Sequence, residues 1–191
     1  FNTCNTEFEF LTGLSVKFFP ENSIPYQQYM NIPIPSLPKI LKKQGYETIA
    51  VHPYYDWFWN RKNAYRYLGF DQFISIKDFN TASLTIANDK VNTGMAGDYI
   101  SDHAMVTKIE TLLNQGNQPK FIFAVSIQNH YPWNNGRYDD HNPLHIQPKQ
   151  PNHLSNSDVN LLQDYSEGVE DANDAVVELI KSIQRSHKNT I

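Results

Sequence analysis

The sequence predicts an α/β fold with a mostly parallel sheet, on three observations. A helical stretch from Ser36 to Gln44 is followed by Gly45 and then by a β-rich run over 46–51, an order typical of α/β domains. Residues 121–127 are apolar on both faces, which is typical of a strand at the centre of a covered sheet. A long amphipathic pattern over 157–183 supplies a helix that could cover such a sheet.

The first half of the chain carries clear signals for each element. We predict a short helix over Glu7–Leu14, and an ordered loop over 18–35 because four prolines exclude a continuous helix there. Ser36 is expected to cap the next helix, which Gly45 ends. A buried strand over 46–51 should follow, then a helix over 60–68 that stops at Gly69 and a short strand near 73–76.

The second half alternates polar loops with apolar elements. Residues 80–97 are polar and are expected to form an exposed loop, whereas 101–114 have the cap and apolar spacing of a helix. The strand over 121–127 is followed by a polar loop over 134–156. The last helix, 157–183, is expected to be weakest at Gly168. These elements predict one α/β domain over residues 1–191.

Composition sets outer limits on function. The chain has 191 residues, 40% of them hydrophobic and 19% charged, which fits a globular domain with its own core. Its net charge of −4 provides no general attraction for nucleic acid, so no nucleic-acid partner is expected. No apolar run approaches the length of a membrane span. Cys4 is the single cysteine, so an internal disulfide is excluded.

The candidate chemistry is concentrated in the first residues of the chain. Thr3 precedes an apolar-acidic run, and we expect a helix to begin close to it. Helix N-termini attract phosphate through unpaired N–H groups and the helix dipole, and a hydroxyl placed there could act as a nucleophile. The alternative is that Thr3 or Asn5 is only a helix cap. Cys4 could also be a nucleophile, but a small buried thiol is the interpretation we prefer.

Two histidines follow predicted strands, His52 after 46–51 and His130 after 121–127. In open α/β sheets, sites form beyond the carboxyl ends of strands, although a histidine there can also be a structural hydrogen-bonding group. Arg61 offers a planar fork that suits phosphate or sulfate oxygens, and Trp59 offers a flat apolar face beside it. The alternative for this pair is a surface arginine next to a core aromatic residue.

Other polar clusters are weaker candidates. His141, His145 and His153 match no familiar metal-ligand spacing, and Asp139-Asp140 is more typical of a solvated turn than of a pair of catalytic carboxylates. The chain also contains no G-x-x-x-x-G-K-[ST] phosphate loop.

In series, several short motifs resemble the lipoteichoic acid synthase and phosphoglycerol transferase family, a sulfatase-like branch of the alkaline phosphatase superfamily. The motifs cover nearly the whole chain in family order. They are Thr3 to Gly13, Ser23 to Tyr29, Gly45-Tyr46 leading to His52-Pro53, Phe58-Trp59-Asn60-Arg61, Leu68 to Asp71, Gly97 to Asp102, and Gln128 to Pro132. The resemblance implies an alkaline-phosphatase-like sandwich of a mostly parallel sheet between helices.

The resemblance also implies residue roles. Thr3 falls on the family's nucleophilic threonine, whose oxygen also binds a divalent metal, Mn²⁺ or Mg²⁺. Trp59, Arg61 and His130 fall on positions that hold the phosphoglycerol group, and His52 on a histidine at the pocket edge. The implied reaction is a two-step transfer from a phospholipid such as phosphatidylglycerol, through a covalent phospho-threonine, to a glycerol-phosphate or glycan acceptor. The implied location is the cell surface, where the chain would be the extracellular catalytic domain of a membrane-anchored bacterial protein.

Departures from the family pattern restrict this expectation. The acidic metal ligand expected upstream of Thr3 and the Asp-His pair expected after the last helix have no counterpart, so we expect a catalytic domain that is incomplete at both ends and inactive alone. Tyr54 stands where the founding synthases tend to be acidic. Two alternatives stay open: a phosphoethanolamine transferase or sulfate-ester hydrolase on the same fold, and a non-catalytic envelope module that binds anionic glycans or headgroups.

Overall fold

The computed structural model describes residues 2–79, 95–96, 99–133 and 154–186. The chain forms two compact units, which are described separately. The first unit combines Phe1–Asp78 with Gln115–Val125, and the second combines Phe79–Asn114 with Ser126–Ile191. The prediction of a single domain over 1–191 stays a prediction.

A parallel sheet of three strands forms the centre of the first unit. Its strands are β1 (Glu47–Val51), β2 (Gln72–Ile74) and β5 (Lys120–Ala124), in the order β2-β1-β5. Register pairs Ala50 of β1 with Phe73 of β2 on one side and with Phe123 of β5 on the other. Because the strands are parallel, their carboxyl ends lie at the same edge of the sheet. The predicted α/β class with a mostly parallel sheet is confirmed.

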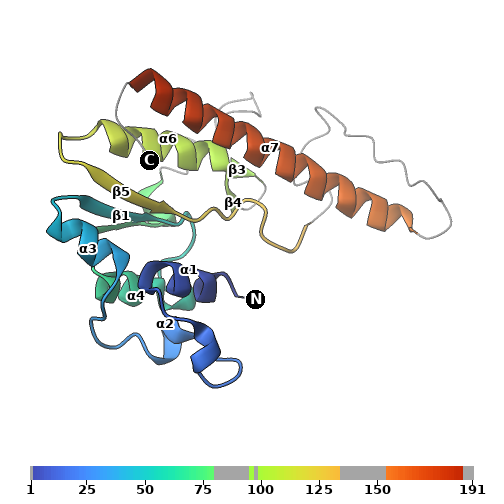
Figure 1. Ribbon diagram of the computed structural model, residues 1–191. Coiled ribbons are helices and arrows are strands. Elements are labelled where there is room, and N and C mark those ends of the chain that lie inside the picture. Colours follow the sequence, from blue (N-terminus) through green and yellow to red (C-terminus); the bar gives the residue numbers. More distant parts are fainter. Residues whose placement is uncertain (1, 80–94, 97–98, 134–153, 187–191) are drawn as a thin grey trace. The chain divides into compact units, whose positions relative to one another are not determined.

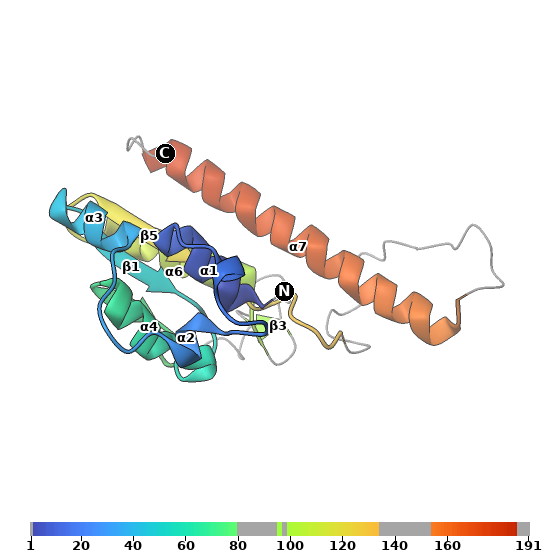
Figure 2. The same ribbon diagram turned by 60° about the horizontal axis from the view of Figure 1, so that its bottom comes forward.

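Four helices of the first unit lie against one face of this sheet (Figure 1). They are α1 (Thr3–Thr12), α2 (Pro25–Gln28), α3 (Leu37–Lys43) and α4 (Arg61–Leu68). Short 3₁₀ helices lie between α1 and α2 (η1, Val16–Phe18), directly before α4 (η2, Phe58–Asn60) and after β2 (η3, Ile76–Asp78). Figure 2 shows the same helices from below, with α2 beside α4. Helix α4 connects β1 to β2, so β1-α4-β2 is a parallel βαβ unit.

The core of the first unit lies between these helices and the sheet. Phe8 of α1 and Tyr26 of α2 are almost completely buried, as is Tyr65 of α4, and their rings meet edge to face. The sheet contributes Ala50 together with the aromatic rings of β2 and β5. Burying one large apolar side chain stabilises the fold by about 1.5–3 kcal/mol, so this cluster anchors α1 and α4.

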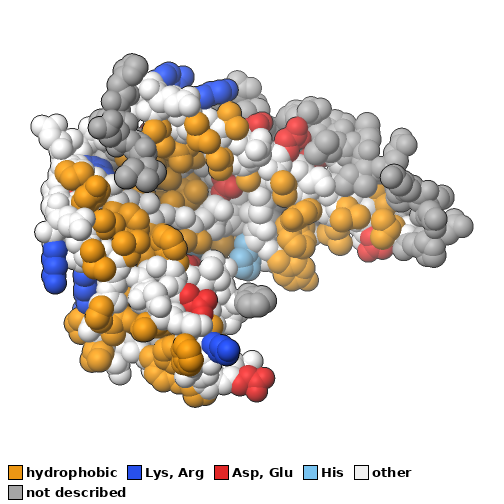
Figure 3. Space-filling model, viewed as in Figure 1, with side chains coloured by type: hydrophobic (Ala, Val, Ile, Leu, Met, Phe, Trp, Pro, Cys, Tyr) orange, Lys and Arg blue, Asp and Glu red, His pale blue; other side chains and the backbone are white. Residues whose placement is uncertain are grey.

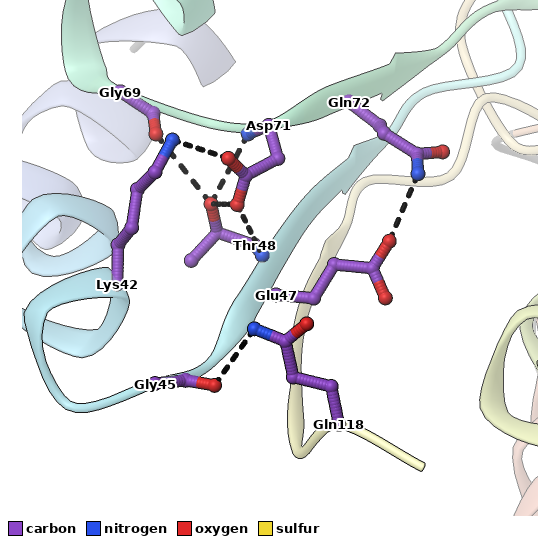
Figure 4. Close-up of polar contacts among 8 residues, drawn as sticks. All are labelled: Lys42, Gly45, Glu47, Thr48, Gly69, Asp71, Gln72 and Gln118. Carbon is purple, nitrogen blue, oxygen red and sulfur yellow. Dashed lines mark hydrogen bonds and ion pairs between the residues drawn. The ribbon is translucent and has the colours of Figure 1, made fainter. Parts of the chain in front are cut away.

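Polar contacts fix the amino ends of β1 and β2 (Figure 4). The Asp71 carboxylate accepts from the Thr48 backbone N–H at 3.0 Å and from the Thr48 hydroxyl at 2.9 Å, and it pairs with Lys42 of α3. Gln72 donates to Glu47 at 2.9 Å, and Gln118 donates to the Gly45 carbonyl. These bonds link the residues at the start of neighbouring strands and so support the register that the backbone pairing gives.

The second unit is built mainly from two helices, α6 (Asp102–Asn114) and α7 (Asn156–Ser186), which pack against each other. A two-stranded antiparallel pair, β3 (Met95–Ala96) and β4 (Tyr99–Ile100), precedes α6. His103 of α6 contacts two acidic residues of α7, Asp171 at 3.3 Å and Glu178 at 2.8 Å. Within the described part of the chain, no helix is both long and apolar enough to cross a membrane.

Helix α7 keeps part of its apolar face in solvent. Its exposed large hydrophobic side chains include Leu162, Tyr165, Val169, Val176 and Ile180. Figure 3 shows hydrophobic surface, in orange, along this helix. The amphipathic spacing predicted from 157–183 is therefore present, but the described residues cover only a portion of the apolar face.

Most predicted helices and strands are present, with shifts at their ends. The largest shift is at α1, which begins at Thr3 and therefore four residues earlier than predicted. Ser36 is the first flanking residue of α3 as predicted, but its side chain donates to the Leu68 carbonyl at 2.5 Å and does not cap the helix. The loop predicted over 18–35 contains one turn of helix, α2, which begins at Pro25.

The prediction that 121–127 form the central strand is wrong for the described residues. The strand, β5, ends at Ala124 and lies at one edge of the sheet, whereas β1 is central. An apolar run shows that a strand is covered on its faces, but not how many neighbours it has. Most of the loops predicted over 80–97 and 134–156, with His141, His145, His153 and Asp139-Asp140, lies outside the described residues.

Candidate active site

Thr3 is the first residue of α1, and its side chain is exposed. The N-cap residue is Asn2, whose side chain makes no capping hydrogen bond, so neither Thr3 nor Asn5 is the cap. Asn5 instead donates from its side chain to the Ser23 carbonyl at 3.1 Å, which ties α1 to the loop before α2. The structure therefore presents the Thr3 hydroxyl at a helix N-terminus, where N–H groups lack partners within the helix.

Cys4 is unsuited to nucleophilic chemistry. Its side chain is 1% exposed and belongs to the hydrophobic core. Burial, reinforced by the negative charge of Glu7, raises the pKa of the thiol to about 11. Since the thiolate is the reactive form, this thiol is inert near neutral pH. The prediction of a buried thiol is confirmed.

Arg61, at the start of α4, is held by a carboxylate on α1. The side chains of Arg61 and Glu7 are each 3% exposed, and Arg61 Nη2 donates to Glu7 Oε1 at 2.7 Å. Arg61 Nε lies 3.2 and 3.3 Å from the two Glu7 oxygens, and the Tyr65 hydroxyl donates to Oε2 at 2.8 Å. This bidentate pair fixes the plane of the guanidinium and joins α1 to α4.

Electrostatics in this buried cluster favour the ion pair. Burial lowers the pKa of Arg61, but the hydrogen bonds and negative charge of Glu7 outweigh it and raise the pKa overall. Burial and then the Glu7 charge hold the pKa of Tyr65 well above its ordinary value, so its hydroxyl stays protonated and can donate. The alternative of a surface arginine is wrong, because the guanidinium is buried.

Two buried polar atoms of the same cluster have no hydrogen-bond partner within the described residues, Arg61 Nη1 and the Tyr26 hydroxyl. An unsatisfied buried donor costs about 1–3 kcal/mol, so native structures rarely retain one without a role. Nη1 is the part of the Arg61 fork that Glu7 leaves unused.

His52 follows β1 directly and is 2% exposed. Its Nδ1 lies 2.8 Å from the carbonyl of Val125, the residue after β5. A carbonyl can only accept, so Nδ1 carries the proton, and the neutral ring is then unprotonated at Nε2. Adjacent parallel strands thus fix both the position and the tautomer of His52, as expected for a residue at their carboxyl ends.

Trp59 and Asn60 turn the chain into α4 with two successive left-handed residues. Their φ angles are 54° and 57°, a conformation that is uncommon for asparagine and rarer for a bulky aromatic residue. Asn60 is held by donating to the Tyr26 carbonyl at 2.6 Å. Left-handed backbone of this kind is strained and is often found at functional sites, so the Trp59 conformation is consistent with a site here.

His130 belongs to the second unit, and its side chain is exposed. The two residues before it are anchored to the helices of that unit. Gln128 is completely buried, accepts from the Asp102 backbone N–H at 2.6 Å and donates to Asp171 of α7 at 2.6 Å. Asn129 donates to the Gly168 carbonyl at 2.7 Å. These amides hold the segment that presents His130.

Asp102, the first residue of α6, is a buried carboxylate that the sequence did not single out. Burial and then the nearby charge of Asp171 raise its pKa to about 6, against opposing effects of Ser126 and His103. Its backbone N–H is satisfied by Gln128, whereas Oδ1 has no hydrogen-bond partner within the described residues.

A divalent metal is implied by the family resemblance, so the available ligands matter. The described residues contain no group of three or more His, Cys, Asp or Glu side chains that could hold a metal ion. Thr3 alone would supply one oxygen, which is far from a complete site for Mn²⁺ or Mg²⁺. The described residues therefore do not assemble the implied site.

Of the five predicted site residues, Thr3, His52, Trp59 and Arg61 lie in the first unit. Arg61 is linked to α1 through Glu7, one helical turn after Thr3, and His52 is fixed at the ends of β1 and β5. Glu7 and Tyr65 were missed. Glu7 carried a signal, since it occurs with Cys4, Phe8 and Leu11 on the buried face of α1, where an unpaired acid would be costly.

Comparison with known proteins shows the family to which the chain belongs. The sequence profile of the sulfatase family matches residues 1–191, and the chain belongs to that family. A protein of Rhizobium meliloti (strain 1021), named for cyclic beta-1,2-glucan modification, is 34% identical over 189 residues, which are 99% of this chain and 27% of that protein. Lipoteichoic acid synthase 1 of Bacillus subtilis (strain 168) is 30% identical over 100 residues, 52% of this chain and 14% of that synthase. The chain thus spans about a quarter or less of these relatives.

Two solved structures share the fold. The lipoteichoic acid synthase LtaP from Listeria monocytogenes aligns with a TM-score of 0.73 and 24% identity, covering 97% of this chain and 40% of that one. The Streptococcus pyogenes phosphoglycerol transferase GacH, in complex with sn-glycerol-1-phosphate, aligns with a TM-score of 0.72 and 23% identity, covering 98% and 46%. The predicted alkaline-phosphatase and sulfatase-like fold, and the resemblance to lipoteichoic acid synthases, are confirmed.

Proposed function

We propose that the protein transfers phosphoglycerol from a phospholipid, such as phosphatidylglycerol, to a cell-envelope acceptor, with Thr3 as the nucleophile. The observation that carries this proposal is the exposed Thr3 hydroxyl on the first residue of α1, in a chain of the sulfatase family. The N–H groups at that helix end, together with the helix dipole, favour the negative charge of a phosphodiester.

The proposed reaction has two displacements at one phosphorus atom. In the first, Thr3 Oγ1 forms a bond to phosphorus, the bond to the diacylglycerol oxygen breaks, and the diacylglycerol leaves with a proton. In the second, an acceptor hydroxyl attacks the phospho-threonine, and Thr3 regains its hydroxyl. Thr3 therefore acts first as nucleophile and then as leaving group.

The remaining candidate residues would hold the phosphoglycerol group. Arg61 Nη1 is the unused donor of a guanidinium whose orientation Glu7 fixes, and it would bind a non-bridging phosphate oxygen. Because Nη1 is buried, this contact requires the side chains around it to move aside. Trp59 would cover the glycerol, and His52 would lie at the pocket edge. The family resemblance assigns His130 to the phosphoglycerol group as well.

The proposal includes a divalent metal, Mn²⁺ or Mg²⁺, with Thr3 as one ligand. Since the described residues hold no cluster of ligands around Thr3, the other ligands have to come from elsewhere in the protein. The proposed location is the outer face of a bacterial membrane, with the anchor outside the described residues.

The acceptor is proposed to be a glucan. The Rhizobium meliloti relative, which aligns with 99% of this chain, is named for modification of a cyclic beta-1,2-glucan, whereas the alignment with lipoteichoic acid synthase 1 covers 52%. Glucan hydroxyls can attack a phospho-threonine as glycerol hydroxyls can.

The test is release of diacylglycerol from phosphatidylglycerol by the full-length protein. Thr3→Ala should lower the rate about a thousandfold or more, because it removes the hydroxyl that forms the proposed covalent intermediate. Thr6→Ala, which removes another exposed threonine of α1, is the matched control and should retain activity. An undiminished rate in Thr3→Ala would refute the nucleophile.

The same assay separates the alternatives. Faster turnover of phosphatidylethanolamine or of an aryl sulfate would identify a phosphoethanolamine transferase or a sulfate-ester hydrolase. Headgroup binding without turnover in the full-length, metal-supplied protein would identify a non-catalytic module.

A further inference from the structure

An exposed pair of aromatic side chains lies just after β1, and packing of the core does not account for it. Tyr55 is 45% exposed and Trp57 is 66% exposed. Their ring centroids are 5.5 Å apart, and the planes differ by 23°, so the rings stack. We propose that Tyr55 and Trp57 form a platform on which sugar rings of a neutral glucan acceptor stack; this inference rests on the proposed function.

The loop that carries the two rings is held firmly. The Phe58 N–H donates to the Tyr55 carbonyl at 3.1 Å, and the Asn60 N–H donates to the Trp57 carbonyl at 2.9 Å. Another ring of the same loop supports the pair, since the ring centroids of Tyr54 and Tyr55 are 4.9 Å apart. A platform that is ordered before binding loses little conformational entropy when a ligand arrives.

The pair lies between two residues of the proposed headgroup site in the sequence. Tyr55 is three residues after His52, and Trp57 is two residues before Trp59. A series of ring contacts links His52 to Trp59. The ring centroid of Tyr54 lies 6.2 Å from that of His52 and 5.3 Å from that of Phe58, and the Phe58 centroid lies 5.4 Å from that of Trp59. A glucan stacked on this platform would therefore lie near two of the residues proposed to hold the headgroup.

Charges around the platform are mostly compensated. Asp56, between the two aromatic residues, pairs with Lys77 at 2.6 Å and with Lys62 at 3.8 Å. The hydrogen bond from Lys77 is the main cause that keeps the pKa of Asp56 below its ordinary value, so the carboxylate stays ionised at neutral pH. These three side chains together carry one positive charge, which neither attracts nor repels an uncharged sugar.

A lipid surface is the competing ligand for exposed aromatic residues. The chain carries a net charge of −4, which provides no general attraction for a bilayer rich in anionic phosphatidylglycerol. The exposed ring surface of Tyr55 and Trp57 suits the flat C–H face of a pyranose, because the negative face of an aromatic ring attracts the slightly positive C–H groups. The cyclic glucan for which the Rhizobium relative is named is a ligand of this kind.

The test is calorimetric titration of the full-length protein with a neutral cyclic β-1,2-glucan. Trp57→Ala should weaken glucan binding about tenfold, which corresponds to the loss of one aromatic contact of roughly 1.4 kcal/mol. Tyr55→Ala should weaken it less, and Trp57→Phe should restore part of the affinity. Phe18→Ala, which truncates an 86% exposed ring elsewhere in the same unit, is the control and should bind as the unaltered protein does.

Each outcome bears on the inference separately from the proposed function. Equal glucan affinity in Trp57→Ala and the unaltered protein would overturn the platform, as would Trp57-dependent flotation with phosphatidylglycerol vesicles without glucan binding. Glucan binding needs no nucleophile, so it is measured in Thr3→Ala as well. Trp57-dependent binding there, together with persisting phospholipid cleavage, would support the platform and refute the proposed nucleophile.

Discussion

At the scale of single residues, Arg61 illustrates how a candidate side chain can be found while its surroundings are missed. Its guanidinium was predicted to face a phosphate, but in the structure Glu7 and Tyr65 occupy most of its surroundings. An interaction between residues 54 positions apart cannot be inferred from local spacing. The sequence showed that Arg61 is an arginine suited to bind an anion, whereas the identity of its partner, Glu7, depends on how α1 packs on α4.

Glu7→Gln should destabilise the first unit strongly. The substitution leaves the buried Arg61 guanidinium without its counter-charge, and breaking a buried ion pair costs about 3–5 kcal/mol, somewhat less when the amide retains a hydrogen bond. Urea unfolding followed by circular dichroism measures the change. Glu9→Gln, on the same helix but bonded to Ser15 and Val16, is the control and should cost about 1 kcal/mol. Equal effects would contradict the importance of the pair.

Asp102 should make the stability of the second unit depend on pH. Its pKa of about 6 in the folded protein lies above its ordinary value of about 3.9, so the folded state binds the proton more tightly. Stability should therefore fall as pH rises from about 4 to about 6 and remain lower above that range. Asp102→Asn should flatten this part of the profile, measured by denaturant unfolding at each pH. An unchanged slope would show that Asp102 is not the group responsible.

At the scale of helices and strands, the local signals located the elements well but not their neighbours. Gly45 and Gly69 end α3 and α4 as predicted, because the left-handed conformation after a helix strongly favours glycine. The apolar pattern of β5 was also correct, yet it could not show that β5 lies at the edge of the three described strands. Strand order depends on contacts far apart in the sequence, which a local pattern does not contain.

Gly69→Ala should destabilise the first unit more than Gly45→Ala. Both glycines have left-handed φ angles, 89° and 88°, so both substitutions carry a conformational cost of about 1–2 kcal/mol. A Cβ at Gly69 would also lie 2.5 Å from Lys39 Cγ, whereas one at Gly45 would meet nothing within 4 Å. Lys39 is held by its bond to the Ile34 carbonyl, which restricts its movement. Thermal unfolding of both variants measures the difference, and equal midpoints would exclude the contact.

At the scale of the whole molecule, the likeness to proteins of the alkaline phosphatase superfamily extends along nearly the entire chain, whereas the chain covers less than half of each solved neighbour. The candidate site is likewise present only in part among the described residues. The described residues supply a candidate nucleophile and residues for a headgroup, but they supply no cluster of metal ligands.

Residues 1–191 by themselves should bind Mn²⁺ only weakly. A single threonine oxygen cannot replace the several oxygen or nitrogen ligands that a tightly bound divalent metal requires. Calorimetric titration with Mn²⁺ should show no saturation at micromolar concentrations, and Thr3→Ala should not change the result. A micromolar or tighter site would contradict this prediction and point to ligands outside the described residues.

The α/β class, most helices and strands, the buried state of Cys4, and the family to which the chain belongs all follow from the amino-acid sequence alone. They do so because they depend on periodicity, on turn residues and on short motifs, all of which are local. Three features are visible only in the folded protein: Glu7 and Tyr65 surround Arg61, Val125 fixes the tautomer of His52, and Tyr55 and Trp57 stack in solvent. Those features depend on side-chain geometry, including contacts between segments far apart in the chain, and are fixed only when the helices and the sheet pack together.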